Sequence, residues 1–426
     1  MDWKQEYEKK KVSAFQAINK IKSGDNVYAG HASTLPYSLT HEMCKQRDRL
    51  NNVKIFMQIP LCDIECIKPG MEEHFQTTFL FANGATAVAS IYEGKSDFIA
   101  ENLSELPKIF LKGAINIDVT FIQVSPPNEY GECSFGVGVL DNYALVETSK
   151  LVIAEVNSNM PFTNATINIS KINQFVESDK PMMIFPVSPI DKLSQKIGDY
   201  IADLIPDRAN LQVGFGSIPN AVLKSLKGKK HLGVHSEMFS DGVMDLVEEG
   251  IITSKYNNLN PGKIVSTFVI GSQKLHNWLN NNSKVLLKPA NYTNDIRVAG
   301  RVDNLMAINS ALQVDLTGQV NAEMIGDKQI SGVGGQSDFI KSAMLSNGGK
   351  SFIALPSTAK SETVSRIVTH LDYGSCVTTP RHDVQYIVTE YGAVDLYGRN
   401  MHERAEALIS IAHPKFRDKL KESLKK

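Results

Sequence analysis

Three glutamates stand at or just beyond the ends of expected strands: Glu155, Glu237 and Glu390. A carboxylate in such a place can act as a nucleophile when backbone N–H groups nearby stabilise charge developing on a carbonyl oxygen. Glu155 also fits a buried hydrogen-bonded acid, and Glu390 fits a structural corner. Chemistry alone does not rank the three, because a lone glutamate is most often a solvated loop residue.

A glycine turn at residues 214–217 could supply the backbone donors. It follows the strand over residues 211–213 and precedes a helix that we expect to begin at Pro219. Proline stands where a dinucleotide-binding fingerprint needs its last glycine, and no GK[ST] sequence follows, so neither nucleotide-binding motif is complete. A plain strand-to-helix turn is the preferred interpretation of this motif alone. A second glycine-rich loop spans residues 331–339, and Lys360 follows a later strand, where it could hold a phosphate.

Apolar runs alternate with helical segments along the whole chain, which is typical of parallel sheets covered on both faces. Expected helices include residues 11–22, 191–204 and 241–249. Expected strands lie at residues 27–30, 53–59, 118–124 and 151–156, and near residues 211, 231, 264, 285, 306, 352 and 384. Three prolines between residues 181 and 189 mark a boundary. We therefore predict an α/β fold of two similar, open, largely parallel-sheet domains, residues 1–185 and 186–426, with a ligand in the cleft between them.

Charge, hydrophobic content and cysteine usage disfavour several classes of protein. The 426 residues carry a net charge of -1 and are 42% hydrophobic, so no overall field favours nucleic acid or an anionic membrane. No apolar leader or run of about 20 apolar residues is present. Five scattered cysteines, including Cys62 and Cys66, complete no zinc set and indicate reduced thiols. We expect a cytoplasmic protein without a bound metal or permanent cofactor.

Several ordered segments together resemble the acetyl-CoA hydrolase/transferase family, the class I CoA-transferases, and in particular their 4-hydroxybutyrate and butyryl-CoA:acetate branch. The resemblance extends from about residue 24 to about residue 417. It rests on residues 124–131, 152–157, 214–222, 236–242, 308–312, 331–339, 388–392 and 409–414. The chain departs from the family pattern around residues 163–170 and 34–36, in the half that the resemblance assigns to the acyl group and carboxylate.

The resemblance implies which residues act. It places the nucleophile at Glu237, an oxyanion-region asparagine at Asn294 (with Asn291 as the alternative register), and CoA itself as a substrate. It also implies a homo-oligomer, dimeric or tetrameric, and a C-terminal domain that binds CoA. The implied CoA contacts are Phe215, Gly216, Ser217, Ile218, Pro219, Gly335, Phe339 and Lys360.

Three other functions remain open at this stage. An acyl-CoA hydrolase on the same framework would use water in place of the acceptor carboxylate. A non-catalytic effector-binding module would leave the match at residues 236–242 without a use. A dehydrogenase is disfavoured by Pro219.

Overall fold

The computed structural model describes residues 2–61 and 63–424, which form two compact units. The first unit contains residues 1–185, 267–292 and 330–334, and the second contains residues 186–266, 293–329 and 335–426. The predicted division after residue 185 did not include the two later segments of the first unit. Hydrogen bonds explain one of them, residues 267–292: Val139 N–H donates to the backbone carbonyl of Thr267 at 2.8 Å, and Leu287 N–H donates to the side-chain Oδ1 of Asn164 at 2.8 Å.

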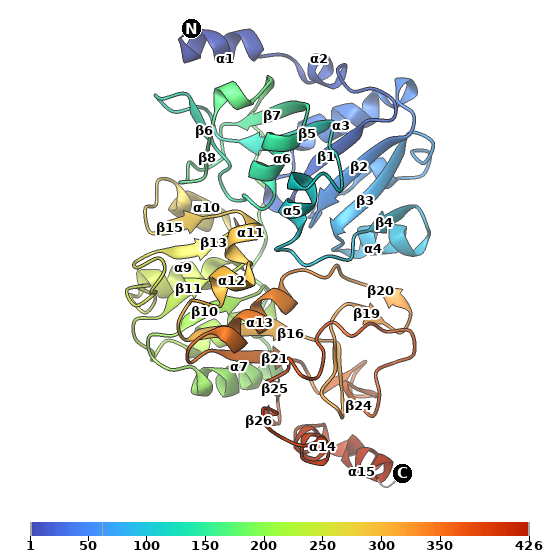
Figure 1. Cartoon of the computed structure of the whole chain (residues 1–426), viewed down its shortest axis with the longest axis vertical. Coiled ribbons are helices and arrows are strands. Elements are labelled where there is room, and N and C mark those ends of the chain that lie inside the picture. Colours follow the sequence, from blue (N-terminus) through green and yellow to red (C-terminus); the bar gives the residue numbers. More distant parts are fainter. Residues whose placement is uncertain (1, 62, 425–426) are drawn as a thin grey trace. The chain divides into compact units, whose positions relative to one another are not determined.

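The first unit is built on an all-parallel sheet in the order β4-β3-β2-β1-β5-β7-β9 (Figure 1). Its strands and helices are α1 (Trp3–Lys10), α2 (Ala14–Ile18), β1 (Asn26–His31), α3 (Tyr37–Lys45), β2 (Val53–Gln58), β3 (Phe75–Phe81), α4 (Ala85–Tyr92), β4 (Ser96–Phe98), α5 (Leu106–Leu111), β5 (Val119–Val124), β6 (Glu132–Ser134), α6 (Asn142–Thr148), β7 (Leu151–Asn157), β8 (Thr166–Asn168), β9 (Gln174–Ser178), β14 (Phe268–Val269), α10 (Gln273–Leu279), β15 (Val285–Leu287) and α11 (Ala290–Thr293). Short 3₁₀ turns lie at η1 (Ala32–Thr34), η2 (Arg47–Arg49), η3 (Glu65–Ile67) and η4 (Ile169–Lys171).

The continuous apolar strands of this sheet are buried on both faces. On one face, Ile55 and Phe121 pack with Leu39 and Met43 of α3 in a single apolar cluster. On the other face, the ring of Tyr28 meets Phe110 of α5 edge-on, with ring centroids 6.3 Å apart. Strands covered by helices on both sides need no polar alternation, which is why these runs are readable in the sequence.

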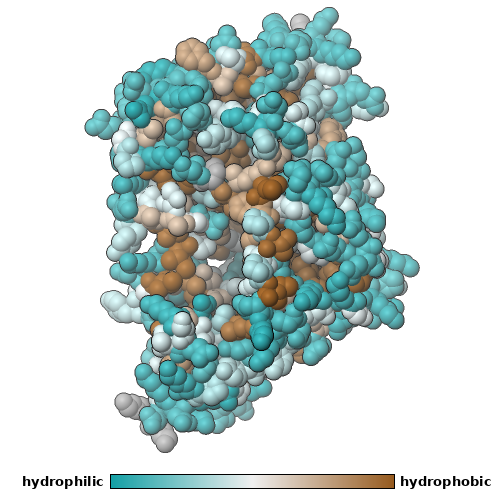
Figure 2. Space-filling model, turned by 180° about the vertical axis from the view of Figure 1, so that it is seen from behind, coloured by the Kyte–Doolittle hydropathy of each residue, from teal (hydrophilic) through white to brown (hydrophobic). Residues whose placement is uncertain are grey.

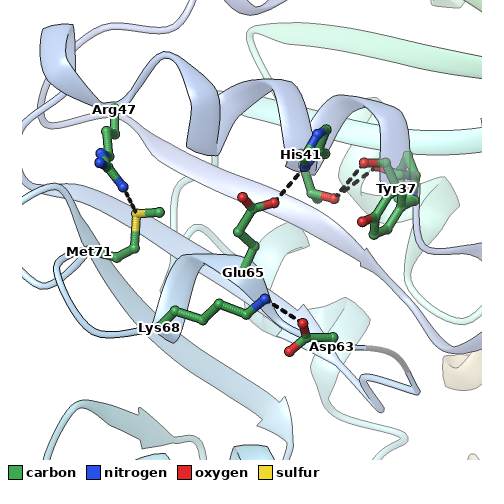
Figure 3. Close-up of polar contacts among 9 residues, drawn as sticks. Tyr37, His41, Arg47, Asp63, Glu65, Lys68 and Met71 are labelled. Atoms are coloured by element: carbon green, nitrogen blue, oxygen red, sulfur yellow. Dashed lines mark hydrogen bonds and ion pairs between the residues drawn. The ribbon is translucent and has the colours of Figure 1, made fainter.

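Helix α3 is also fastened to the segment that follows β2 (Figure 3). His41 Nδ1 lies 2.6 Å from Glu65 Oε2, and Arg47 Nη1 donates to the sulfur of Met71 at 3.8 Å. Lys68 forms an ion pair with Asp63 within the same segment. These contacts hold the residues beyond the end of β2 against a helix rather than leaving them as a free loop.

The second unit repeats this style. Within it a sheet runs in the order β13-β11-β10-β16-β21-β25-β26, parallel except for the last pair (Figure 1). Its elements are α7 (Lys192–Leu204), β10 (Asn210–Val213), α8 (Ser217–Ser225), β11 (Gly233–His235), β12 (Met238–Phe239), α9 (Asp241–Glu248), β13 (Ile264–Ser266), α12 (Ile296–Ala299), β16 (Leu305–Ser310), β17 (Gln313–Asp315), β18 (Val320–Asn321), β19 (Met324–Ile325), β20 (Lys328–Gln329), α13 (Gln336–Leu345), β21 (Lys350–Ala354), β22 (Thr358–Ala359), β23 (Val364–Ser365), β24 (Ile367–Val368), β25 (Tyr386–Thr389), β26 (Gly392–Asp395), α14 (Met401–Ser410) and α15 (Pro414–Ser423).

The predicted fold class, two largely parallel α/β domains, is confirmed, although two predicted helices have different bounds. The helix predicted over residues 11–22 is only α2, because Ser13 and Gln16 form a capping box that starts it late. Helix α8 begins at Ser217, two residues before the predicted Pro219. Proline is tolerated there because N–H groups in the first helical turn have no acceptor within the helix.

In each unit the strand order reverses beside the first strand of the sheet. The chain adds β2 on one side of β1 and β5 on the other, and it adds β11 and β16 on either side of β10. Ligands of open α/β sheets bind at the carboxyl ends of strands at such reversal points. The two units therefore each offer one such place, after His31 and after Val213.

Most of the face drawn in Figure 2 is hydrophilic, and apolar residues form smaller groups on it. Across residues 2–61 and 63–424, no helix has both the length and the apolar character needed to cross a bilayer. In the same ranges, no three histidine, cysteine, aspartate or glutamate side chains come together as possible metal ligands. Four cysteines are free thiols, whereas Cys62 lies outside the described residues.

Candidate active site

Glu237 lies in the short connection between β11 and β12, at the carboxyl end of a central strand of the second unit. Its own carbonyl accepts a hydrogen bond from Ser266 Oγ at 3.0 Å, which fixes the backbone. The predicted helix that follows it is present as α9, with Ser240 at its N-cap and Gly250, at φ 76°, just after its end. Glu237 is therefore held between two strands and a helix start.

Ser236 explains why a serine precedes this glutamate. Its hydroxyl is buried and lies 3.1 Å from both the N–H and the carbonyl oxygen of Val213, the last residue of β10. Its backbone N–H donates to Val265 O at 3.0 Å. The Ser236 side chain thus joins the end of β11, which leads to Glu237, to the end of β10, which leads into the glycine turn.

The carboxyl group of Glu237 is in an unusual electrostatic position. The residue as a whole is half-buried, so part of it is open to a ligand, yet its carboxyl group is surrounded closely. Desolvation by this burial raises the pKa to about 7; the Asn294 hydrogen bond lowers the pKa and the charge of Asp338 raises it. Titration near neutral pH is typical of groups that take part in catalysis.

Asn294 is the asparagine that reaches Glu237. Its Nδ2 donates to Glu237 Oε2 at 2.9 Å, and its side chain is fully buried. His235 supports it, because its Nε2–H donates to the carbonyl of Thr293 at 2.8 Å. Burial lowers the pKa of His235 to about 4, so the ring is neutral and this hydrogen bond persists at physiological pH. Asn291, the alternative register, lies in α11.

Gly335 approaches the same carboxylate. A Cβ atom at this position would overlap both Glu237 Oε2 and Asn294 Nδ2, so glycine is required here for space. Gly335 is also the N-cap of α13, a helix of 10 residues. The amino end of α13, with its unpaired N–H groups and positive dipole end, therefore lies beside the carboxyl group of Glu237.

In the glycine turn after β10, glycine is required at position 216 for its backbone conformation rather than for space. Gly216 has φ 127°, which side-chain-bearing residues rarely adopt, and it is the N-cap of α8. Phe215 is 42% exposed, whereas Ile218 and Pro219 are buried. Ser217 Oγ accepts a hydrogen bond from Ser194 Oγ at 3.0 Å. The turn thus presents one exposed aromatic ring above a fixed helix start.

The other two expected CoA contacts differ in exposure. Phe339 is fully buried in a small cluster with Leu305 and Ala343, and its ring lies edge-on to His235 at 6.5 Å. Its predicted contact with CoA stays a prediction. Lys360 is exposed on the turn between β22 and β23, where it has φ 49°.

Serine residues hold the other two glutamates in place. Glu155 is fully buried and accepts from the N–H of Ser38 at 2.9 Å and from its hydroxyl at 3.1 Å. Glu390 accepts from the N–H of Ser357 at 2.9 Å and from its hydroxyl at 2.5 Å. Glu155 of β7 is thus joined to the first turn of α3, and Glu390 after β25 is joined to the segment that follows β21, which is a structural arrangement.

Sequence reasoning missed His235, Ser236 and Asp338 as parts of the site. Asp338 stands in the first turn of α13 and is buried. The available signal was position: His235 and Ser236 come directly before the glutamate at a strand end, and Asp338 lies within the second glycine-rich loop, three residues after Gly335. Their partners lie far away in the chain, so the contacts themselves were not readable.

Known proteins are similar to this chain over its whole length. The acetyl-CoA hydrolase/transferase N-terminal domain matches residues 1–188, and the C-terminal domain of the same family matches residues 271–424. The 4-hydroxybutyrate coenzyme A transferase of Clostridium kluyveri is 45% identical over the full length of both chains. The butyryl-CoA:acetate CoA-transferase of Anaerostipes caccae is 39% identical, over 99% of this chain and 97% of its own.

A solved structure extends the likeness to three dimensions. The 4-hydroxybutyrate CoA-transferase of Porphyromonas gingivalis superposes with a TM-score of 0.86 at 38% identity, covering 100% of this chain and 99% of that one. The resemblance stated from the sequence is therefore confirmed over the whole chain. This chain belongs to the acetyl-CoA hydrolase/transferase family.

Proposed function

We propose that the protein transfers CoA between a short-chain acyl-CoA and a small carboxylate such as acetate, through a covalent glutamyl-CoA thioester on Glu237. One observation carries this proposal. In a chain of this family, the carboxyl group of Glu237 lies beside the amide of Asn294 and the amino end of α13. A carboxylate nucleophile and preorganised donors are the two parts that acyl transfer needs.

The first half-reaction forms the covalent intermediate. An ionised oxygen of Glu237 attacks the thioester carbonyl, the C–S bond breaks, and CoA leaves as a thiolate, which gives an acyl–glutamyl anhydride. The thiolate then attacks the glutamyl carbonyl of that anhydride. The donor carboxylate departs, and Glu237 holds CoA as a thioester.

The second half-reaction reverses these steps with the acceptor. The acceptor carboxylate attacks the glutamyl thioester carbonyl and releases the thiolate, and the thiolate then attacks the acceptor's acyl carbon. The products are a new acyl-CoA and a free Glu237 carboxylate. Because one thioester is exchanged for another, no nucleotide is consumed; the anhydride must meanwhile be kept from water.

Each addition places negative charge on a carbonyl oxygen. The N–H groups in the first turn of α13 have no partner within the helix and point toward its amino end, where Gly335 meets the Glu237 carboxyl. Those N–H groups and Asn294 Nδ2 are the donors that we assign to the oxyanion. Losing one such donor typically costs about 10²–10³ in rate.

The proposed CoA site lies on the same unit as the nucleophile. The glycine turn from Phe215 to Pro219 is tied to Glu237 through Ser236, so the turn and the nucleophile keep a fixed spacing. Lys360 is exposed and positively charged, which suits a phosphate of the nucleotide end. Binding energy from these remote groups can be used at the reacting carbonyl. The proposal also includes a cytoplasmic location and assembly into a homo-oligomer.

Acetate dependence separates transfer from hydrolysis. We expect butyryl-CoA to be consumed, and acetyl-CoA to form, only when acetate is added. Release of free CoA at the same rate without acetate would instead establish the hydrolase. Free CoA and both thioesters are measured by chromatography.

Trapping identifies the nucleophile. Incubation with acyl-CoA alone, followed by borohydride, should reduce a glutamyl thioester, and peptide mass mapping should place the reduced residue at Glu237. A reduced residue at Glu155 or Glu390 would overturn the assignment. The Glu237→Gln variant is the control, because it forms no thioester.

A further inference from the structure

The amino end of α13 has to be held in place, because its N–H groups are donors that we assign to the oxyanion. Apolar packing holds the body of this helix on β16 and β21 (Figure 1). Phe339 lies in a buried cluster with Leu305, and Ile340 lies in another with Val320. Hydrophobic burial has no direction, so it leaves the position of the helix along its own axis weakly defined.

The chain that leads into α13 does not belong to the same unit as the helix. Residues 330–334 are part of the first unit, whereas Gly335, the helix and Glu237 are part of the second. An N-cap side chain often fixes the start of a helix. Gly335 occupies the N-cap of α13 and has no side chain for this purpose. Contacts that fix the first turn relative to Glu237 therefore have to come from other parts of the second unit.

Two threonines of the second unit provide such contacts. Gln336 and Ser337 are the first two residues of α13. Gln336 Nε2 donates to Thr379 Oγ1 at 3.1 Å, and Ser337 Oγ donates to the carbonyl oxygen of Thr378 at 3.0 Å. Both threonines are buried. Because hydrogen bonds have preferred distances and angles, two of them at one helix start define both its axial position and its rotation.

The two threonines are themselves held by a small sheet. Val320 of β18 and Thr379 exchange backbone hydrogen bonds, with N–H to oxygen distances of 3.1 and 3.2 Å. Ala322 N–H donates to Thr378 Oγ1 at 2.9 Å. Strand β18 belongs to the three-stranded sheet β18-β17-β24. This sheet therefore supports the backbone of both threonines, and they present a hydroxyl and a carbonyl oxygen to α13.

A shift of this helix start would be felt at the nucleophile. Gly335 lies so close to Glu237 that a Cβ atom there would overlap Oε2. Gln336 and Ser337 follow directly, so a movement of the first turn moves its N–H groups relative to the carboxyl by a similar amount. A displacement of about 1 Å can cost about 10²-fold in rate. It would also move the positive end of the helix dipole away from the ionised carboxylate.

We propose that Thr378 and Thr379 are positioning residues for CoA transfer, which hold the amino end of α13 against the carboxyl group of Glu237. They act through Ser337 and Gln336 rather than by contact with the substrate. This inference rests on the proposed function and adds to it the part of the fold that keeps the oxyanion donors in place.

The main test is Thr379→Val, which removes the acceptor hydroxyl and keeps the shape of the side chain. kcat and KM are measured with butyryl-CoA and acetate as a function of pH. We expect kcat to fall by about 10- to 100-fold. KM for butyryl-CoA should stay within about threefold, because the N–H groups act on charge that develops only in the transition state. The rising limb of the pH profile should move to higher pH by about half a unit.

Two further variants examine the same hydrogen bond from both sides. Gln336→Met removes the donor from a half-buried side chain, so it tests the proposal even if Thr379→Val folds poorly. It should cause the same loss, and the double variant should lose no more than either single variant, because all three lack one and the same bond. Thr379→Ser restores the hydroxyl and should return kcat to within about threefold of the wild type.

Thr317→Val is the matched control. Thr317 lies between β17 and β18 of the same small sheet, and its hydroxyl donates to Asp315 Oδ1 at 2.6 Å rather than to α13. We expect it to lower the thermal stability, as the loss of a hydrogen bond does. Its kcat should stay within about twofold of the wild type, with an unmoved pH profile, because the start of α13 keeps its contacts.

The outcomes separate the two proposals. If the wild type moves no CoA from butyryl-CoA to acetate, the proposed function fails and this inference fails with it. If transfer proceeds but Thr379→Val and Gln336→Met keep the kcat and the pH profile of the wild type, the function stands and the positioning role is overturned. The positioning role is also overturned if Thr317→Val changes kcat and the pH profile as much as Thr379→Val does, since the effect would then come from the stability of the small sheet.

Discussion

Glu237 and Glu390 follow parallel strands and Glu155 lies within one, β7, but the surroundings of the three carboxyl groups differ. Glu155 and Glu390 each accept two hydrogen bonds from one serine, through its N–H and its hydroxyl. Glu237 has one side-chain amide donor and a glycine so close that no side chain fits there. Burial raises the pKa of both Glu155 and Glu237, so hydrogen bonding is what distinguishes them. A carboxylate with its lone pairs occupied fastens a fold, whereas one with free lone pairs can attack when it is ionised.

Replacing the three glutamates should show the largest difference. Glu237→Gln removes the nucleophile, so we expect CoA transfer to fall by about 10⁴-fold or more, with binding of acyl-CoA retained. Glu155→Gln and Glu390→Gln should keep kcat within about tenfold per folded molecule and instead lower the free energy of unfolding by about 1–3 kcal/mol. Steady-state kinetics and urea unfolding on all three variants provide the comparison. If Glu237→Gln kept the activity of the wild type, Glu237 would not be the nucleophile, and its proposed difference from Glu155 and Glu390 would be wrong.

Crowding the Glu237 carboxyl should have the next largest effect. A methyl at Gly335 would overlap Glu237 Oε2 and Asn294 Nδ2, so Gly335→Ala must displace one of them. A shift of about 1 Å at a reacting group can cost about 10²-fold in rate. Gly228→Ala is the control, since a Cβ there meets no atom within 4 Å. We expect kcat to fall only for Gly335→Ala, and equal activity of both variants would argue against the close approach.

The sequence predicted the strands better than the site. Buried parallel strands such as β5 and β7 are mostly apolar over six or seven residues, so the sequence pattern reveals them. The choice of Glu237 over Glu155 needed the family resemblance, because the serines that hold Glu155 and Glu390 are 117 and 33 residues away in the chain. The bonds from Asn294 and His235 are also long-range, and no local pattern encodes them.

Helix starts were the least predictable part of the fold. The helical periodicity of residues 11–22 was real, yet Ser13 and Gln16 begin α2 only at Ala14. At α8 the proline suggested the first position, but the glycine before Ser217 sets the start instead. Local capping chemistry decides these starts, which lie three residues after the predicted start for α2 and two residues before it for α8.

Tuning Glu237 through its two polar neighbours should shift the pH profile in opposite directions. The amide of Asn294 lowers the pKa of Glu237, and the charge of Asp338 raises it. Because the ionised form attacks, the rising limb of kcat/KM should move to higher pH in Asn294→Ala, and the loss at pH 7 should reach about 10²-fold because an oxyanion donor is lost as well. In Asp338→Asn the limb should move to lower pH. If the limb moved in the same direction in both variants, the shifts would not come from the pKa of Glu237, and a change in fold would be the explanation.

The smallest effect should appear in stability. The folded pKa of Glu237 is raised to about 7 from 4.5, so the folded state binds a proton more tightly than the unfolded chain does. The stabilisation from this group is complete below about pH 4.5 and is lost as pH rises through about 7. The free energy of unfolding of the wild type should therefore fall relative to Glu237→Gln between pH 5 and pH 8, by about 1–3 kcal/mol. Urea unfolding of both proteins at the two pH values measures this difference. A constant difference would mean that the Glu237 carboxyl is as well solvated in the folded protein as in the unfolded chain, which would contradict the burial that raises its pKa.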